Sequence, residues 1–299
     1  MTPSFLAALS LPWPFDREYM QLALGAALVV GICAPLIGVF LVQKQMALMG
    51  DGVGHLAFAG VAAGLLLDVW PMWSALVVAI LGALAIDRLQ RRGRATGDLA
   101  LAIVFYGGIA LGVVLVSRSG AGSLSIVEYL FGSILTVTSH DLLLIVGLGL
   151  VIVATLAVFG RPLLATVLDE EAARVAGLPV DASSALLSVL TAVTVVTAMR
   201  VVGVLLVAAL MVLPVASSRL LARSFRGTLT IAVLVGVGSA VVGLAAARTW
   251  AMAPGGTIVL AATACFAVVA VLTSGRGAGR PTTGRRPRAD DQQTGRTDG

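Results

Sequence analysis

The feature that most constrains this chain is a succession of apolar runs, each close to the length of one membrane crossing, between Met20 and Thr273. A helix needs roughly 20 apolar residues to cross the hydrocarbon core of a bilayer. The composition agrees, because 59% of the residues are hydrophobic and only 12% are charged, where a soluble domain has roughly 25% charged residues. The sequence therefore predicts an all-α integral membrane protein, a polytopic bundle of about eight or nine transmembrane helices.

The apolar runs divide the chain into individual spans. We expect these at 21–42, 53–67, 73–87, 97–117, 139–159, 182–199, 201–217, 228–247 and 256–273. The stretch 182–221 is interrupted only by Arg200, and we interpret it as two short helices joined by a tight reversal. If it is a single helix, the number of spans falls to eight.

The cationic residues predict the orientation, because loops on the cytoplasmic side carry an excess of Lys and Arg. One placement of the loops puts 16 cations on one side and 4 on the other, the four being Arg17, Arg118, Arg200 and Arg248. This predicts a bacterial inner-membrane protein with residues 1–20 outside, a transmembrane permease domain over 21–273 and a cytoplasmic C-terminus. The tail 274–299 is rich in Gly, Arg, Pro and Thr, a composition typical of disorder.

Several functional classes are not supported by the sequence. The net charge of +5 comes from cations in loops and in the tail, where they act as topology signals, so no nucleic-acid partner is expected. Lys44 is the single lysine, which leaves no place for a phosphate-binding Gly-x-x-x-x-Gly-Lys loop. No metalloprotease or serine-hydrolase motif occurs. We expect no enzymatic activity, and any ATP hydrolysis must come from another chain.

Ionisable residues inside apolar spans are costly and are functional candidates for that reason. Asp51 and His55 are four residues apart, so on a helix they share one face. A carboxylate and an imidazole together form a half-site for Zn²⁺, Mn²⁺ or Fe²⁺. The alternative is that Asp51 caps the helix and His55 is an ordinary interfacial residue. The glycines at 50, 52 and 54 favour a locally broken helix near a transport pathway.

Two ligands from one chain do not fill a metal site. The other histidine, His140, lies at the start of a predicted span, where we expect it to cap the helix. A twofold dimer with the Asp51 face at its axis would supply two Asp and two His side chains. A metal site in this chain therefore predicts a homodimer.

The longest cytoplasmic connection, residues 161–180, carries signals of a short helix. Asp169 is a good N-cap, acidic residues follow it, and Gly177 lies near the expected end. A short amphipathic helix on the cytoplasmic face is a natural docking surface for a partner. A plain linker helix is the alternative.

Four separate segments resemble the permease subunits of zinc/manganese/iron-type ABC transporters. The residues Ala47-Leu-Met-Gly-Asp-Gly-Val-Gly-His55 resemble the family's "ALMGDALSH" segment. Val202 to Pro214, Pro254 to Val259 and the stretch from Glu170 to Val180 match in order, and Asp98 lies where the family tends to place an acid. Gly54 and Ala59 depart from the pattern, since the family usually has Ser and Pro there.

The resemblance implies a homodimeric permease with a cytoplasmic ATP-binding subunit and an extracytoplasmic metal-binding protein. It implies that Asp51 and His55 bind the transported zinc, manganese or iron ion, with no permanently bound cofactor. It also implies that the short cytoplasmic helix couples to the ATPase through Glu170, Glu171, Ala172 and Gly177.

Two other transport functions remain as alternatives. A permease for iron–siderophore or cobalamin carries a large substrate and needs no liganding Asp and His. An ATPase-independent secondary transporter needs a coupling acid in mid-span. Apart from Asp51, the candidates lie near span ends or in loops, at Asp68, Asp87, Asp98, Glu128 and Asp141.

Overall fold

The computed structural model describes residues 13–91, 97–119, 129–133 and 137–277. Over these ranges the chain forms helices and connecting turns, with no β-strand. The helices are α1 (Glu18–Gln43), α2 (Met49–Leu66), α3 (Pro71–Arg91), α4 (Gly97–Ser119), α6 (Ser139–Leu168), α7 (Glu170–Val175), α8 (Val180–Met199), α9 (Val207–Leu221), α10 (Phe225–Trp250) and α11 (Pro254–Gly277).

Eight of the described helices are long and apolar enough to cross a membrane. The ninth apolar helix, α9, has 15 residues and is therefore only about 23 Å long, short of the roughly 30 Å hydrocarbon core. The all-α fold with eight or nine spans is confirmed. The first 12 residues and residues 278–299 lie outside the described part, so the predicted tail is described only where α11 continues past 273 to Gly277.

The predicted reversal near Arg200 is a turn that occupies residues 200–206, so the helix after it begins at Val207 and not at 201. Gly203 has a φ of +86°, which favours glycine because a Cβ crowds this backbone conformation. The amides of Val204 and Leu205 donate to the carbonyls of Tyr129 and Leu130 at 3.0 and 3.2 Å. These bonds to a distant segment satisfy the backbone where the helix is interrupted.

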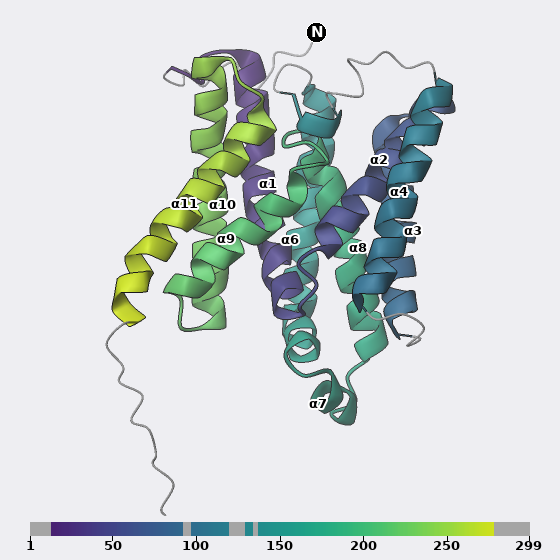
Figure 1. The fold of residues 1–299 in the computed structure, drawn as a ribbon, viewed down its shortest axis with the longest axis vertical. Coiled ribbons are helices and arrows are strands. Elements are labelled where there is room, and N and C mark those ends of the chain that lie inside the picture. Colours follow the sequence, from purple (N-terminus) through teal and green to yellow (C-terminus); the bar gives the residue numbers. More distant parts are fainter. Residues whose placement is uncertain (1–12, 92–96, 120–128, 134–136, 278–299) are drawn as a thin grey trace, which may run out of the picture.

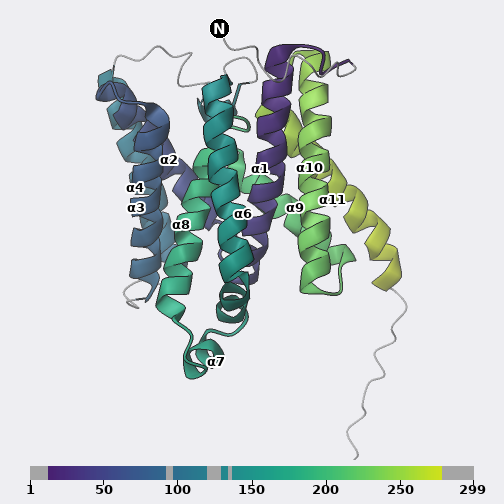
Figure 2. The same ribbon diagram turned by 180° about the vertical axis from the view of Figure 1, so that it is seen from behind.

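The long helices run side by side, with α7 at one end of the bundle and the start of α1 at the other (Figure 1). Helix α1 packs against α6, α8, α9 and α10, whereas α2 packs against α3, α4 and α8. Figure 2 shows the opposite side, where α6, α1 and α10 lie in a row. Helices α1 and α8, together with a direct contact between α2 and α9, therefore join a group formed by α9, α10 and α11 to a group formed by α2, α3 and α4.

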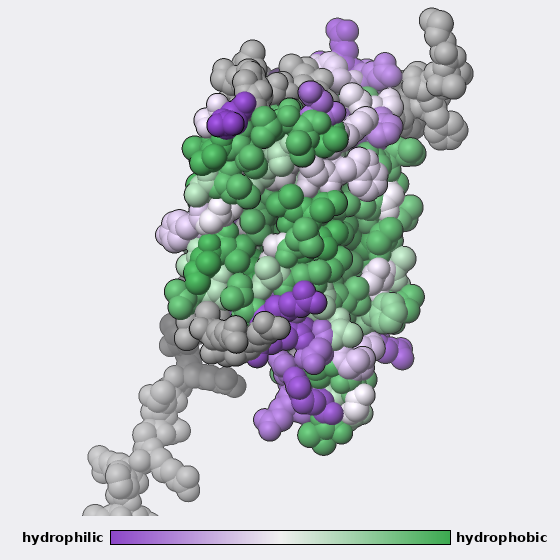
Figure 3. Space-filling model, turned by 90° about the vertical axis from the view of Figure 1, so that its right-hand side faces the viewer, coloured by the Kyte–Doolittle hydropathy of each residue, from purple (hydrophilic) through white to green (hydrophobic). Residues whose placement is uncertain are grey.

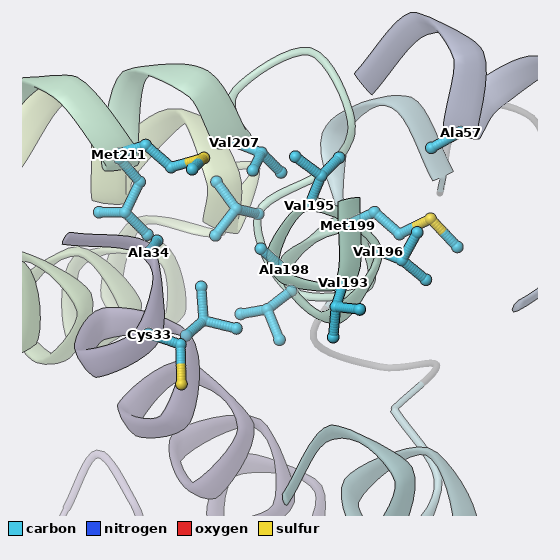
Figure 4. Packing of buried hydrophobic residues seen from close by; sticks show 14 of the residues in the cluster. Cys33, Ala34, Ala57, Val193, Val195, Val196, Ala198, Met199, Val207 and Met211 are labelled. Atoms are coloured by element: carbon cyan, nitrogen blue, oxygen red, sulfur yellow. The ribbon is translucent and has the colours of Figure 1, made fainter. Parts of the chain in front are cut away.

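Small residues let the helices approach closely, as is usual in membranes. A Cβ on Gly38 of α1 would lie 2.0 Å from the carbonyl oxygen of Met211 on α9, and one on Gly60 of α2 would lie 2.6 Å from Cα of Ala75 on α3. Around these contacts the core is apolar, and Cys33 and Ala34 of α1 lie in it with Met211 (Figure 4). Both cysteines, Cys33 and Cys265, are free.

The outer surface matches a lipid environment. A broad apolar band separates hydrophilic ends in Figure 3. Large apolar side chains are exposed on the lengths of several helices, including Leu81 on α3, Ile103 on α4 and Leu143 on α6. Such exposure would favour aggregation in water but is expected for helices that face hydrocarbon chains.

Candidate metal site and coupling segment

Asp51 and His55 lie on the first two turns of α2. The N-cap of this helix is Leu48, which makes no side-chain capping bond, so Asp51 is not the cap. Asp51 belongs to the first turn, where the partial positive charge of the helix N-terminus stabilises a carboxylate. Its Oδ1 lies 3.9 Å from Nε2 of His55 one turn later. The predicted sharing of one helix face is therefore observed.

The glycines around the pair do not break the helix, and this prediction is wrong. Helix α2 is continuous from Met49 to Leu66. A Cβ on Gly52 would lie 2.8 Å from Cδ1 of Leu101 on α4, and one on Gly54 would lie 3.2 Å from the carbonyl oxygen of Val204. The glycines instead allow neighbouring segments to pack closely on the faces of α2 that do not carry Asp51 and His55. This packing overrides the low helix propensity of glycine.

The polar pair occupies the remaining, more open face of α2. The side chain of Asp51 is 34% exposed and that of His55 is 14% exposed. The imidazole lies edge-on to the ring of Phe105 on α4, with centroids 4.5 Å apart. Phe105 thereby restricts the rotation of the imidazole, and Nε2 of His55 remains on the side of Asp51.

The separation of the two donor atoms is close to what one metal ion needs. Ligands at about 2.1 Å from a tetrahedral ion stand roughly 3.4 Å apart, so small side-chain rotations bring 3.9 Å into range. Among the described residues, no group of three or more His, Cys, Asp or Glu side chains is placed so that it could hold a metal ion. Over these ranges one chain therefore offers only two of the side-chain donors that such a site would need.

His140 does not cap α6, contrary to the prediction. The N-cap is Thr138, whose hydroxyl accepts from the amide of Asp141 at 3.2 Å, while Asp141 Oδ2 accepts from the amide of Thr138 at 3.1 Å. The ring of His140 lies against Trp70, with centroids 4.5 Å apart. The side chain of Asp98 lies outside the described residues.

The predicted cytoplasmic helix is α7, which projects at one end of the bundle (Figure 1). Asp169 is its N-cap, as predicted, and accepts from the amide of Ala172 at 2.9 Å. Gly177 follows with a φ of +79°, which explains why a glycine stands there. The predicted coupling residues Glu170, Glu171, Ala172 and Gly177 are all exposed.

Sequence reasoning missed an ion-pair network that anchors this segment. Arg91, the last residue of α3, pairs with the carboxylate of Asp181 on α8 and lies 2.8 Å from Asp87 Oδ2. Arg174 of α7 lies 3.8 Å from the same carboxylate of Asp181. Asp181 therefore links α3 to α7. The spacing of Asp87 and Arg91 indicates a helical ion pair, but Asp181 is 90 residues away in sequence.

Lys44 joins the same region to the start of α2. It is the C-cap of α1, and its Nζ donates to the hydroxyl of Ser184 on α8 at 2.6 Å. Burial lowers the pKa of Lys44, and this effect is opposed by the negative charges of Asp87 and Glu170. Only a short connection separates Lys44 from α2, so α8 is tied to the helix that carries Asp51.

The comparison with known protein families decides the class. Residues 16–273 match the ABC 3 transport family. The chain belongs to this family. The match runs from just before α1 to residue 273 in α11, and it includes both the Asp51–His55 face and α7.

Relatives in the ABC 3 family are similar along most of their length. The chain is 34% identical over 263 residues to the manganese transport system membrane protein MntC of Halalkalibacterium halodurans, covering 87% of this chain and 90% of that one. It is 32% identical over 257 residues to the high-affinity zinc uptake system membrane protein ZnuB of Haemophilus influenzae, covering 86% and 97%.

The family fold also appears among solved structures. PsaBC from Streptococcus pneumoniae, solved in complex with a Fab, aligns with a TM-score of 0.78 and 32% identity over 85% of this chain and 91% of the other. An inward-facing putative metal-chelate type ABC transporter aligns with a TM-score of 0.65 at 21% identity, which supports the fold alone.

Proposed function

We propose that this chain is the membrane-spanning permease subunit of a bacterial ABC importer for a divalent transition metal, either zinc, manganese or iron. The observation that carries the proposal is the Asp51–His55 pair on an open face of α2, in a chain of the ABC 3 transport family. Carboxylate and imidazole donors suit all three metals. Relatives named for manganese and for zinc uptake agree with this range.

The ion binds between two copies of the chain. Each copy brings one Asp51 and one His55 to a twofold axis, which gives four ligands and completes the half-site. The donors replace water around the ion and hold it weakly enough for release. The metal is therefore the transported substrate and not a resident cofactor.

ATP is hydrolysed by a separate subunit that docks on α7. The exposed residues Glu170, Glu171, Ala172 and Gly177 form the contact, and the α7 end of the bundle faces the cytoplasm. The positions of the cations support this orientation: Arg88, Arg174 and Arg226 belong to the α7 end, whereas Arg17 and Arg248 belong to the other. An extracytoplasmic binding protein delivers the metal to that other end.

Movement of α7 reaches the metal site along the ion-pair network. Asp181 and Arg91 connect α7 to α3, which packs on α2. Ser184 and Lys44 connect α8 to the α1–α2 turn. Closure of the ATPase subunits would thus shift the helices that carry Asp51 and alternate the access to it.

The two alternative transport functions have less support. Membership of the ABC 3 family favours an ATP-driven importer over a secondary transporter. A compact pair of metal ligands favours a bare ion over a chelate such as a siderophore.

The test measures cellular zinc, manganese and iron in metal-starved cells that co-express the chain with its ATPase and binding protein. Asp51→Asn removes a charged ligand at nearly constant volume, and we expect it to abolish the rise of one metal. Asp68→Asn is the matched control, since Asp68 ends the same helix region in a left-handed conformation that Asn tolerates. Equal accumulation by both variants, at equal membrane levels, would remove Asp51 from the site.

A further inference from the structure

A groove on the outer surface of the bundle has no role in the proposed metal pathway. Its floor is α1 and its walls are α6 and α10, the three helices that lie in a row in Figure 2. The cavity volume is about 640 Å³. Most of its lining is apolar, with Leu36 and Phe40 on the floor, Leu156 and Leu164 on one wall and Leu229 on the other.

The lining also contains two arginines on opposite walls, Arg161 of α6 and Arg226 of α10. Both side chains are exposed, and within the described ranges neither guanidinium forms an ion pair or a hydrogen bond. Arg91, Arg174 and Arg200, in contrast, each pair with a carboxylate. Two positive charges at one edge of an apolar groove thus remain without an anion.

Both arginines belong to the same boundary of the hydrocarbon core. Arg161 follows Ser139, the first residue of α6, by 22 positions, which is about 33 Å of helix and close to the thickness of that core. Arg226 is the second residue of α10, whose other end carries Trp250 at the opposite boundary. A ligand in the groove therefore has its apolar part among hydrocarbon chains and its charged part at the interface.

We propose that this groove binds an anionic phospholipid of the cytoplasmic leaflet. One acyl chain lies along Leu36, Leu156 and Leu229, and the phosphate accepts hydrogen bonds from Arg161 and Arg226. Guanidinium groups bind phosphate through paired N–H donors. Basic pockets between transmembrane helices on the cytoplasmic side are typical sites for such headgroups. The leaflet rests on the orientation proposed above, whereas the binding itself does not.

Gly160 provides a steric test of the acyl-chain position. It lines the groove on α6, and a Cβ built on it meets nothing within 4 Å. A larger side chain therefore enters the groove without displacing a neighbouring helix. Gly160→Leu blocks the chain site and leaves both arginines in place.

The experiment counts lipids retained by the purified permease–ATPase complex, by native mass spectrometry after incubation with vesicles of either phosphatidylglycerol or phosphatidylcholine. We expect preferential retention of phosphatidylglycerol by the wild type. Arg161→Gln with Arg226→Gln should weaken it by roughly five-fold per arginine, the equivalent of about 1 kcal/mol for one basic residue at an anionic surface. Gly160→Leu should lower retention of both lipids.

The control is Arg88→Gln with Arg118→Gln, which removes the same charge from two exposed positions on α3 and α4. It should retain phosphatidylglycerol like the wild type. Equal retention of the two lipids by the wild type, or unchanged retention by the Arg161/Arg226 variant, would overturn the proposal. Loss of the ATPase from that variant with its lipids intact would assign the arginines to the partner subunit instead. None of these readouts requires metal transport.

Discussion

Arg200, in the turn after α8, donates a hydrogen bond of 2.8 Å to the carboxylate of Asp141 in the first turn of α6. The side chain of Asp141 is 2% exposed and that of Arg200 is 15% exposed. The same carboxylate accepts from the hydroxyl of Thr138 at 2.8 Å, and the guanidinium lies 5.2 Å from the ring centroid of Tyr129. One buried ion pair thus holds together α6, the turn after α8 and the segment around Tyr129.

Asp141→Ala should strongly destabilise this end of the bundle. It removes the carboxylate that pairs with the largely buried guanidinium of Arg200, and it removes half of the capping box of α6. Breaking a buried ion pair from one side costs about 3–5 kcal/mol. We expect a clearly lower melting temperature for the detergent-purified protein. Asp141→Asn keeps an acceptor for Thr138, so its melting temperature should lie between those of the wild type and the Ala variant. An Ala variant that melts with the wild type would deny the pair a structural role.

Arg91 should affect the coupling of ATP hydrolysis to metal import more than it affects folding. Arg91→Glu places a negative charge beside Asp87 and Asp181 and separates α3 from α7 and α8. We expect metal import to fall several-fold while the complex still hydrolyses ATP. Adding Asp181→Arg to Arg91→Glu restores opposite charges and should recover part of the import. The measurement is the ratio of metal imported to ATP hydrolysed in proteoliposomes; the same ratio in all variants would disconnect the network from coupling.

Glycine contacts predict which positions tolerate a methyl group. Gly38→Ala forces Cβ into the carbonyl of Met211, 2.0 Å away, and overpacking of this kind typically costs about 1–3 kcal/mol. Gly147→Ala, on α6, meets nothing within 4 Å and should gain up to about 1 kcal/mol of helix propensity. Melting temperatures should therefore move in opposite directions. A rise for both would mean that helix propensity and not packing governs these sites, and a fall for both would contradict the propensity gain expected at Gly147.

The bilayer made much of the fold predictable. Because a span must be long and apolar, the runs between Met20 and Thr273 located nearly all the helices. The turn at 200–206 was misplaced by several residues, since its ends depend on hydrogen bonds to Tyr129 and Leu130. Such partners are some 70 residues away in sequence and leave no local periodicity.

The candidate site was predictable only where local helix geometry decides it. The spacing of Asp51 and His55 sufficed to place them on one face. The role assigned to Gly52 and Gly54 failed, because contacts with Leu101 and Val204 stabilise a helix that propensity alone disfavours. Asp181 was overlooked for the same reason, since its partner Arg91 comes from another helix.

The twofold arrangement proposed for the metal site makes a geometric prediction at Leu48. This residue is three positions before Asp51 and seven before His55, so it lies on the same face, and its side chain is 65% exposed. Residues at a twofold axis meet their own copies. Leu48→Cys, in a background with Cys33→Ser and Cys265→Ser, should therefore form a disulfide between two copies on mild oxidation.

Leu143→Cys is the matched control for this cross-link, because Leu143 on α6 is 72% exposed but belongs to a different face of the bundle. It should stay monomeric on a non-reducing gel under the same conditions. Bound metal should hold the two copies in a fixed arrangement and thereby change the rate at which the two cysteines at position 48 cross-link. Asp51→Asn should abolish this effect of the metal. Cross-linking at 143 and none at 48 would place the axis elsewhere, and the four-ligand site would then have to be abandoned.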